Sequence, residues 1–295
     1  MVYLLYASLW RFVRLIPEKS AYLLADSLAA IGYKRNSKRV QRLRTNYQAI
    51  LDFLGEDSSR RYLEDLVQEG LRSSMRYWCD TFRISDWSTE RAIETTEIVG
   101  LENLQRLYNS GAGVIVAVPH AGNWDHAGYT ITSIGMPVHT VAEHLEPERL
   151  FLRFLEHRAR MGMTVLDLDK SPMPKLVEFL KQGKLVALVS DRDLSKSGID
   201  VNFFGKIARM PGGAAALAYD TGAHLVTAFV NYSKNGIRVE FSRELSVNRN
   251  LDRASEIRRV TQEVASQFER SIGANPTSWH MLQRIFIDSE FRSRS

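Results

Sequence analysis

The chain has 295 residues, of which 44% are hydrophobic and 25% charged, a composition that excludes a disordered or collagen-like protein. Its single cysteine, Cys79, excludes an internal disulfide and a cysteine-ligated zinc site and favours a reducing compartment. The net charge of +5 suits an anionic membrane surface or a phosphorylated ligand and does not by itself indicate nucleic acid.

Residues 1–97 are predicted to form a helical N-terminal region. Apolar residues recur there at helical spacing: Leu5, Leu9, Phe12, Val13 and Ile16. Pro17 marks a break, and helical patterns follow at 20–31 and 62–82. No run of about 18 uncharged apolar residues is present, so a transmembrane helix is not expected. A signal peptide is not expected either, because Arg11 and Arg14 interrupt the apolar stretch.

From residue 98 to residue 295 the pattern predicts an α/β core. Short β-branched runs predict strands at 113–120, 137–143, 163–168 and 184–191. Helical segments alternate with them at 123–133, 147–161 and 173–182. Nearly continuous apolar runs, separated by helical segments, are typical of parallel strands in a sheet that helices cover on both faces. The predicted fold class is therefore α/β, with a mainly parallel central sheet flanked by helices.

The C-terminal part of this core predicts four further elements. They are a short strand at 201–205, a helix at 211–222, a hairpin at 224–245 that turns at Lys234-Asn235-Gly236, and a long helix at 251–273.

Two of the predicted strands end in ionisable residues. The strand at 113–120 leads into Pro119-His120-Ala121-Gly122-Asn123-Trp124-Asp125, and the strand at 184–191 leads into Asp191-Arg192-Asp193. If both are parallel members of one sheet, His120 and Asp191 emerge at the same edge, where ligands of α/β sheets collect. A neutral imidazole oriented by a carboxylate is a general base suited to a hydroxyl group.

The carboxylate that orients His120 can be Asp125 or Asp191. A helix starting at His120 would place Asp125 about 140° round from the histidine. Asp191 is therefore the alternative orienting group, and Asp125 would then hold the turn or an arginine, with Arg158 as the candidate. A metal site formed by His120, Asp125 and His126 is disfavoured, because no further ligands cluster with them.

Pro211-Gly212-Gly213 opens the helix predicted at 211–222, with Arg209 just before it. The free N–H groups of such a helix start can receive a phosphate or a developing oxyanion. Close packing of the helix explains the same glycines and is the favoured interpretation. The motifs of a nucleophile elbow, a P-loop, a dinucleotide fold and an H-E-x-x-H metal site do not occur.

The segment from Pro119 to Asp125 resembles the H-x4-[D/E] signature of glycerolipid-type acyltransferases. More narrowly, the chain resembles the bacterial branch that contains the lipid A acyltransferases and the phosphatidylinositol mannoside acyltransferases. Other segments agree in order: Arg158 with Met161-Gly162-Met163, Asp191-Arg192-Asp193-Leu194, Val201 to Gly205, Met210 to Gly213, Leu217-Ala218, Thr221 to Ala223, and Asn275-Pro276 with Trp279 and Arg284. The combination Asn-Trp-Asp, Arg-Asp-Leu and Phe-Phe-Gly is closer to the mannoside branch.

The resemblance implies transfer of a fatty acyl group, usually palmitoyl, from acyl-CoA to a mannose hydroxyl of a phosphatidylinositol mannoside. It implies His120 as general base, Asp125 or Asp191 as its carboxylate, and no cofactor, because the thioester is already activated. The substrate-binding candidates are Asn123, Arg158, Arg192, Arg209, Gly212 and Gly213. The family often has Glu where Asp191 stands. Because the aspartate side chain is shorter than that of glutamate, its reach to His120 is the feature that the structure must test.

A membrane acceptor gives the N-terminal region an expected role at the cytoplasmic face of the cell membrane, as a peripheral protein. A helix with Leu5, Leu9, Trp10 and Phe12, beside Arg11 and Arg14, can lie in a membrane interface. Six cations at 34–44 can face anionic headgroups: Lys34, Arg35, Lys38, Arg39, Arg42 and Arg44.

Two alternatives remain. One is a lipid A-type acyltransferase with another glycolipid acceptor. The other is a non-catalytic basic module that binds a membrane or nucleic acid through 34–44, although the chain carries no recognisable nucleic-acid fold signature.

Overall fold

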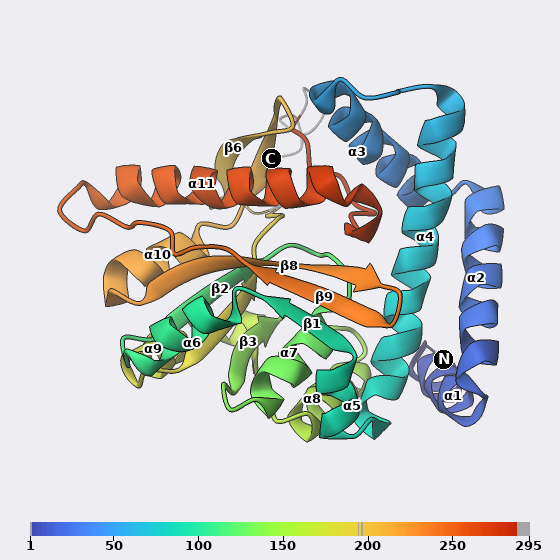
Figure 1. Ribbon diagram of the computed structural model, residues 1–295, viewed down its shortest axis with the longest axis horizontal. Coiled ribbons are helices and arrows are strands. Elements are labelled where there is room, and N and C mark those ends of the chain that lie inside the picture. The colour runs from blue at the N-terminus through green and yellow to red at the C-terminus, as the bar shows by residue number, and fades with distance from the viewer. Residues whose placement is uncertain (1, 194, 196, 288–295) are drawn as a thin grey trace.

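The computed structural model describes residues 2–193, 195 and 197–287 of the chain. A seven-stranded sheet lies at the centre of the protein, and helices pack against it (Figure 1). Five of its six strand pairings are parallel, and only β8–β9 is antiparallel. The predicted α/β class with a mainly parallel sheet is confirmed.

The strand order of the central sheet is β1-β9-β8-β2-β5-β3-β4. Its strands are β1 (Thr96–Val99), β2 (Val114–Val118), β3 (Val138–Ala142), β4 (Thr164–Asp167), β5 (Leu185–Val189), β8 (His224–Ser233) and β9 (Gly236–Phe241). The apolar runs of β2 and β5 fill the middle of the sheet because both faces are covered, and Val114, Ile115, Ala117 and Val186 are fully buried.

Most helices of the core lie where the sequence predicts helical segments. The helices that connect strands are α6 (Leu101–Asn109), α7 (Trp124–Ser133), α8 (Glu148–Arg160), α9 (Met173–Lys181) and α10 (Gly213–Thr221), and α11 (Arg253–Ala274) follows the last strand. Of these, α6 was not predicted. The short helix α5 (Thr89–Glu94) and strand β1 were missed as well, because six and four residues carry little periodicity.

The run predicted as a strand at 201–205 forms β6 (Ile199–Phe203) and does not enter the central sheet. It pairs in an antiparallel hairpin with β7 (Lys206–Met210), which the sequence did not predict. The turn residue Phe204 has a φ of 49° and its ring is buried against Phe203. The hairpin therefore closes one side of the main hydrophobic core.

The N-terminal region is helical, and ahead of α5 it contains four α-helices: α1 (Val2–Leu15), α2 (Glu18–Arg35), α3 (Lys38–Leu54) and α4 (Arg60–Arg83). Helix α4 runs alongside α2 and meets α1 near its end (Figure 1). The predicted boundary at residue 97 falls inside β1. Tyr47 and Ile50 of α3 are fully buried in the same core cluster as Ile115 of β2, so this region packs on the core.

The assignment of Trp10 to a membrane-facing surface is wrong. Trp10 is 2% exposed and packs against Phe82, Phe154 and His157, with ring centroids 4.9 to 5.0 Å apart. Phe12 and Leu5, in contrast, are 51% and 67% exposed. Helix α1 is apolar on more than one side, so one face joins the core while the other stays outside. Among the described residues, no helix is long and apolar enough to span a bilayer.

Candidate active site

Strands β2 and β5 bring His120 and Asp191 together. They are parallel neighbours, and Val118 lies opposite Val189 in the register. The Ser190 N–H donates to the Val118 carbonyl at 2.8 Å, so the alignment continues beyond the last strand residues. Two residues further along each strand stand His120 and Asp191. Their meeting at the carboxyl edge is therefore a consequence of strand adjacency and register.

Asp191 holds His120 through two hydrogen bonds and is itself held by a third. The His120 ring nitrogen Nδ1 lies 2.6 Å from Asp191 Oδ1, and the backbone N–H of His120 donates to Oδ2 at 3.0 Å. The indole N–H of Trp279 donates to the same Oδ2 at 2.8 Å. The Asp191 side chain is fully buried, while that of His120 is 33% exposed. The shorter aspartate side chain thus reaches the histidine, and the imidazole remains accessible from outside.

The electrostatics of this pair favour a charged carboxylate and a basic imidazole. Burial opposes ionisation of Asp191, but the interaction with His120 outweighs it and lowers the carboxyl pKa. Burial also disfavours the imidazolium, but the charge and hydrogen bond of Asp191 outweigh it and raise the pKa of His120. Because an ionised carboxylate only accepts, Nδ1 carries the proton in the neutral ring and Nε2 carries the lone pair. Nε2 can therefore take a proton from a hydroxyl group.

A C-terminal segment, residues 278–280, fixes the loop that carries His120. The Gly122 N–H donates to the Ser278 carbonyl at 2.8 Å, and the His280 N–H donates to the His120 carbonyl at 2.8 Å. Gly122 has a φ of 56°, and a Cβ there would lie 2.4 Å from the Val230 carbonyl oxygen, so only glycine fits. The same segment places the Trp279 indole within hydrogen-bond distance of Asp191.

Helix α3 holds this segment and the residues that follow it. The amide Nδ2 of Asn46 donates to the carbonyls of Met281 and Gln283 at 2.8 and 3.0 Å. The Tyr47 hydroxyl donates to the Trp279 carbonyl at 3.3 Å. The N-terminal region is therefore connected to the His120 loop through backbone groups of residues 279–283.

Asp125 does not orient His120. It is 2% exposed at the start of α7, where Arg158 of α8 donates to its Oδ1 at 2.7 Å. The Tyr77 hydroxyl of α4 donates to Oδ2 at 3.3 Å. Burial opposes the ionised carboxylate, but Arg158 outweighs it and lowers the pKa of Asp125. The ion pair between Asp125 and Arg158 that the sequence suggested is present and joins α7 to α8, and the Tyr77 hydrogen bond adds α4.

The other candidate residues have mostly structural partners. Asn123 is fully buried, and its Oδ1 accepts from the His126 N–H at 2.9 Å as the N-cap of α7. Arg192 donates to Gln283 Oε1 at 2.6 Å and lies 3.5 Å from Glu143. Arg209 pairs with Asp200 across the β6–β7 hairpin at 2.6 Å. Of these three residues, Arg192 is the immediate neighbour of Asp191.

The two glycines at the start of α10 differ. A Cβ at Gly212 would lie 2.6 Å from Ile199 and 3.2 Å from Ile257, so close packing explains this glycine. A Cβ at Gly213 would meet nothing within 4 Å. The packing interpretation thus accounts for one position, and anion binding at Gly213 stays a prediction.

The suggested metal ligands His120, Asp125 and His126 point to different partners. The Nε2 atom of His126 lies 3.1 Å from the Ala92 carbonyl, and burial lowers the pKa of this histidine to about 4. Within the described part of the chain, His144, Asp167 and Asp169 have ligand atoms within 4.8 Å of one another. His144 already contacts Asp167 and Glu148, so a metal ion would compete with these ion pairs.

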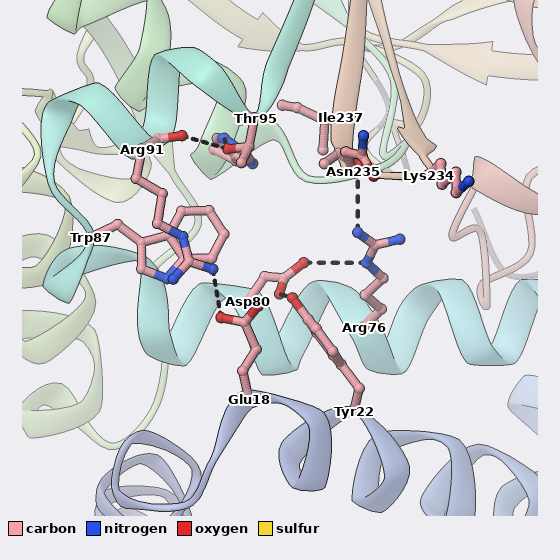
Figure 2. Close-up of a pocket in the computed structure, with 12 residues that line it drawn as sticks. Glu18, Tyr22, Arg76, Asp80, Trp87, Arg91, Thr95, Lys234, Asn235 and Ile237 are labelled. Atoms are coloured by element: carbon pink, nitrogen blue, oxygen red, sulfur yellow. Dashed lines mark hydrogen bonds and ion pairs between the residues drawn. The ribbon is translucent and has the colours of Figure 1, made fainter.

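A polar cavity of about 190 Å³ lies between α2, α4 and the β8–β9 turn (Figure 2). Four of its charged side chains pair with one another: Arg91 pairs with Glu18, and Arg76 lies 3.6 Å from Asp80. The Tyr22 hydroxyl donates to Asp80 at 2.7 Å, and burial raises the pKa of that carboxyl to about 6. Around this cavity the Arg91–Glu18 ion pair therefore joins α5 to α2, and the Tyr22–Asp80 hydrogen bond joins α2 to α4.

The sequence predicts no role for Tyr77, Trp279 or His280. Trp279 belongs to a segment that resembles the family, but its hydrogen bond to Asp191 spans 88 positions along the chain. Burial lowers the pKa of His280 to about 3, so this ring is neutral, and its Nε2 lies 2.8 Å from Ser73 Oγ. No periodicity or spacing signal marks such long-range partners.

Comparison with known proteins gives concordant matches over nearly the whole chain. The model of the bacterial lipid A biosynthesis acyltransferase family matches residues 1–287. A phosphatidylinositol mannoside acyltransferase of Mycolicibacterium smegmatis is 34% identical over 285 residues, which cover 96% of this chain and 90% of the relative. A phosphatidylinositol mannoside acyltransferase of Mycobacterium tuberculosis is 32% identical over 294 residues, which cover 98% of this chain and 90% of the relative.

Proposed function

The chain belongs to the bacterial lipid A biosynthesis acyltransferase family, and from this premise we propose that it acylates a mannose hydroxyl of a phosphatidylinositol mannoside. The proposed donor is acyl-CoA, usually with a palmitoyl chain. The relatives of about one-third identity, both named for this acceptor, support the choice of substrate. The observation that carries the proposed chemistry is the buried Asp191 carboxylate, which holds an accessible His120 in the tautomer of a general base.

In the proposed reaction, His120 Nε2 takes the proton of the acceptor hydroxyl as its oxygen attacks the thioester carbonyl. Asp191 stabilises the imidazolium that forms. The tetrahedral intermediate then collapses, the C–S bond breaks, and the imidazolium returns its proton to the departing CoA thiolate. The products are an ester and free CoA, and no cofactor takes part. A general base of this kind contributes about 10²- to 10⁴-fold in rate.

Asp125 and Arg158 act indirectly in this proposal. Their ion pair fixes the first turn of α7, which follows the His120 loop. Arg192, beside Asp191, and the open backbone at Gly213 are the groups proposed to receive anionic parts of the substrates. Neither role requires Asp125 to contact the reacting atoms.

Attachment to the cytoplasmic face of the membrane is part of the proposal. Large apolar side chains of α1 and α2 face outward, with exposed fractions of 67% for Leu5, 73% for Leu15 and 67% for Leu23. The small residues Ala21, Ala25 and Ala29 form the buried side of α2. Of the six cations in 34–44, Arg44 pairs with Glu64 at 2.7 Å, while the other five are exposed. Such a surface suits an anionic bilayer.

The test is an assay with radiolabelled palmitoyl-CoA and purified glycolipids, including a phosphatidylinositol mannoside and a lipid A precursor. Wild-type protein is expected to label the mannoside, and His120→Ala to lose at least about 10² of the rate while keeping its circular dichroism spectrum. Label on the lipid A precursor alone would favour the acceptor in the family's description. Near-full activity of His120→Ala, or membrane binding without any transfer, would contradict the proposal.

A further inference from the structure

A second cavity, of about 380 Å³, opens between α1 and α8 and has a strongly basic lining. Four arginines line it: Arg14 of α1 and Arg149, Arg153 and Arg160 of α8. Glu156 is the one acidic residue in the lining among the described residues. The cavity therefore combines cations from the N-terminal region with cations from the α/β core.

Two of these arginines form ion pairs with carboxylates, and the other two do not in the described part of the chain. Arg14 pairs with Asp86, and Arg160 pairs with Glu156 at 2.6 Å. Within the described part of the chain, Arg149 and Arg153 form no ion pair with a carboxylate, and the Arg153 guanidinium lies 4.9 Å from the centre of the Trp10 ring. Two such guanidinium groups, four residues apart on one helix, favour a phosphate, whose oxygens they can bind in pairs.

The buried side of the cavity offers an additional polar atom. His157 lines it, is 4% exposed and stacks edge-on against Trp10. Burial lowers the pKa of His157 to about 4, so the ring is neutral at pH 7. Its buried Nε2 has no hydrogen-bond partner among the described residues. A buried polar atom without a hydrogen-bond partner is uncommon in a folded protein. A ligand in the cavity would supply a partner for the Nε2 atom of His157.

One leucine in the lining of the cavity is exposed: Leu152, at 51%. A soluble anion would gain nothing from this apolar side chain. Elsewhere on α1, Leu4 and Leu5 are each 67% exposed. An anionic phospholipid brings together a phosphate for the arginines and acyl chains for exposed apolar side chains, as expected at a membrane interface.

We propose that the α1–α8 cavity binds the phosphate of an anionic phospholipid headgroup, so that the lipid links α1 to α8 and docks the enzyme on the bilayer. This inference rests on the membrane attachment included in the proposed function. It differs from general attraction to the basic run 34–44, because it assigns binding to Arg149 and Arg153 of the core, which take no part in the proposed chemistry.

The first test is vesicle sedimentation with the full chain. The cavity variant is Arg149→Gln/Arg153→Gln, and the matched control is Arg39→Gln/Arg42→Gln, which removes two exposed cations from α3. Binding to phosphatidylcholine vesicles that contain phosphatidylinositol is compared with binding to pure phosphatidylcholine. The cavity variant is expected to lose about tenfold more affinity for the anionic vesicles than the control. Equal losses, or a larger loss in the control, would overturn the inference. Unchanged melting temperatures verify that both variants fold.

The second test separates a lipid headgroup from other phosphates. A short-chain, water-soluble phosphatidylinositol is titrated into wild-type protein beside inorganic phosphate and CoA, at constant ionic strength. The lipid is expected to bind at least about tenfold more tightly than inorganic phosphate, and this preference is expected to disappear in Arg149→Gln/Arg153→Gln. Equal binding of inorganic phosphate, or CoA as the ligand that the variant loses, would overturn the headgroup assignment.

An activity assay in detergent micelles keeps this inference apart from the proposed function. With the acceptor dispersed in micelles, the cavity variant is expected to retain wild-type turnover, since Arg149 and Arg153 lie outside the reacting groups. If His120→Ala abolishes turnover while the cavity variant still binds vesicles like the control, the headgroup site fails and the acyltransferase stands. If the cavity variant loses turnover in micelles, the separation of the two sites fails.

Discussion

Two buried carboxylates, Asp191 at the end of β5 and Asp125 at the start of α7, support the His120 loop in different ways. Both are at most 2% exposed, and both have a lowered pKa despite burial. Their partners differ: Asp191 contacts a histidine that is one-third exposed, whereas Asp125 contacts a largely buried arginine. An arginine keeps its charge throughout, but a histidine can gain and lose a proton near neutral pH. The nature of the partner, more than the burial, is therefore the basis for proposing that Asp191, and not Asp125, acts in the chemistry.

The largest expected difference between the two concerns turnover. Asp191→Asn is expected to lower kcat by about 10²- to 10⁴-fold, because an amide neither stabilises the imidazolium nor enforces the tautomer with a free Nε2. Initial rates with radiolabelled palmitoyl-CoA measure the loss. The control is the unfolding curve, since the amide introduced by the substitution still offers an oxygen to Trp279. Wild-type turnover in a folded Asp191→Asn protein would remove Asp191 from the mechanism.

The corresponding substitution at Asp125 is expected to lower the free energy of unfolding. Asp125→Asn leaves the Arg158 guanidinium buried without its counter-charge, which costs about 3–5 kcal/mol in the free energy of unfolding. Urea denaturation measures it. The double variant Asp125→Leu/Arg158→Met removes both charges and is expected to be milder than the single change. A fully stable Asp125→Asn protein without activity would instead place Asp125 in the chemistry and reverse the comparison.

A smaller effect is expected from the indole that supports Asp191. In the proposed reaction turnover requires neutral His120, so kcat/KM of the wild type is expected to rise as the pH passes the raised pKa of this histidine. Trp279→Phe removes a donor to Asp191, concentrates negative charge on the carboxylate and strengthens its hold on the imidazolium. The rising limb of the kcat/KM profile is then expected to move to higher pH, and kcat/KM at neutral pH is expected to fall about tenfold. A lower rate with an unshifted limb would indicate a purely structural role.

The smallest effect is expected where the C-terminal segment meets α4. Ser73→Ala removes the hydroxyl beside His280 Nε2 and is expected to lower the free energy of unfolding by about 1 kcal/mol. The pH profile of kcat/KM is expected to stay unchanged, because His280 is neutral across the working range. Thermal unfolding and the same rate assay check both parts. A shifted profile would show that His280 influences the charge of His120.

Much of the sheet was accessible to sequence reasoning because its strands are apolar runs of ordinary length. The predictions at 113–120 and 184–191 contain β2 and β5, and the hairpin turn at Lys234-Asn235-Gly236 lies where β8 and β9 meet. The elements that the sequence does not predict, such as β1 and β7, are short, and polar and apolar residues do not alternate regularly in Thr-Glu-Ile-Val or Lys-Ile-Ala-Arg-Met. Trp10 was misplaced because a helix with apolar residues on several sides does not reveal which side the core covers.

The sequence by itself determined the alternation of strands and helices, and with it the fact that His120 and Asp191 each follow a strand. Only the tertiary structure decided that these two strands are neighbours in register, that Asp125 belongs to Arg158, and that Trp279 completes the site. The reason is physical: strand content follows from local side-chain patterns, whereas these contacts join residues 33 to 88 positions apart and depend on how the whole core packs.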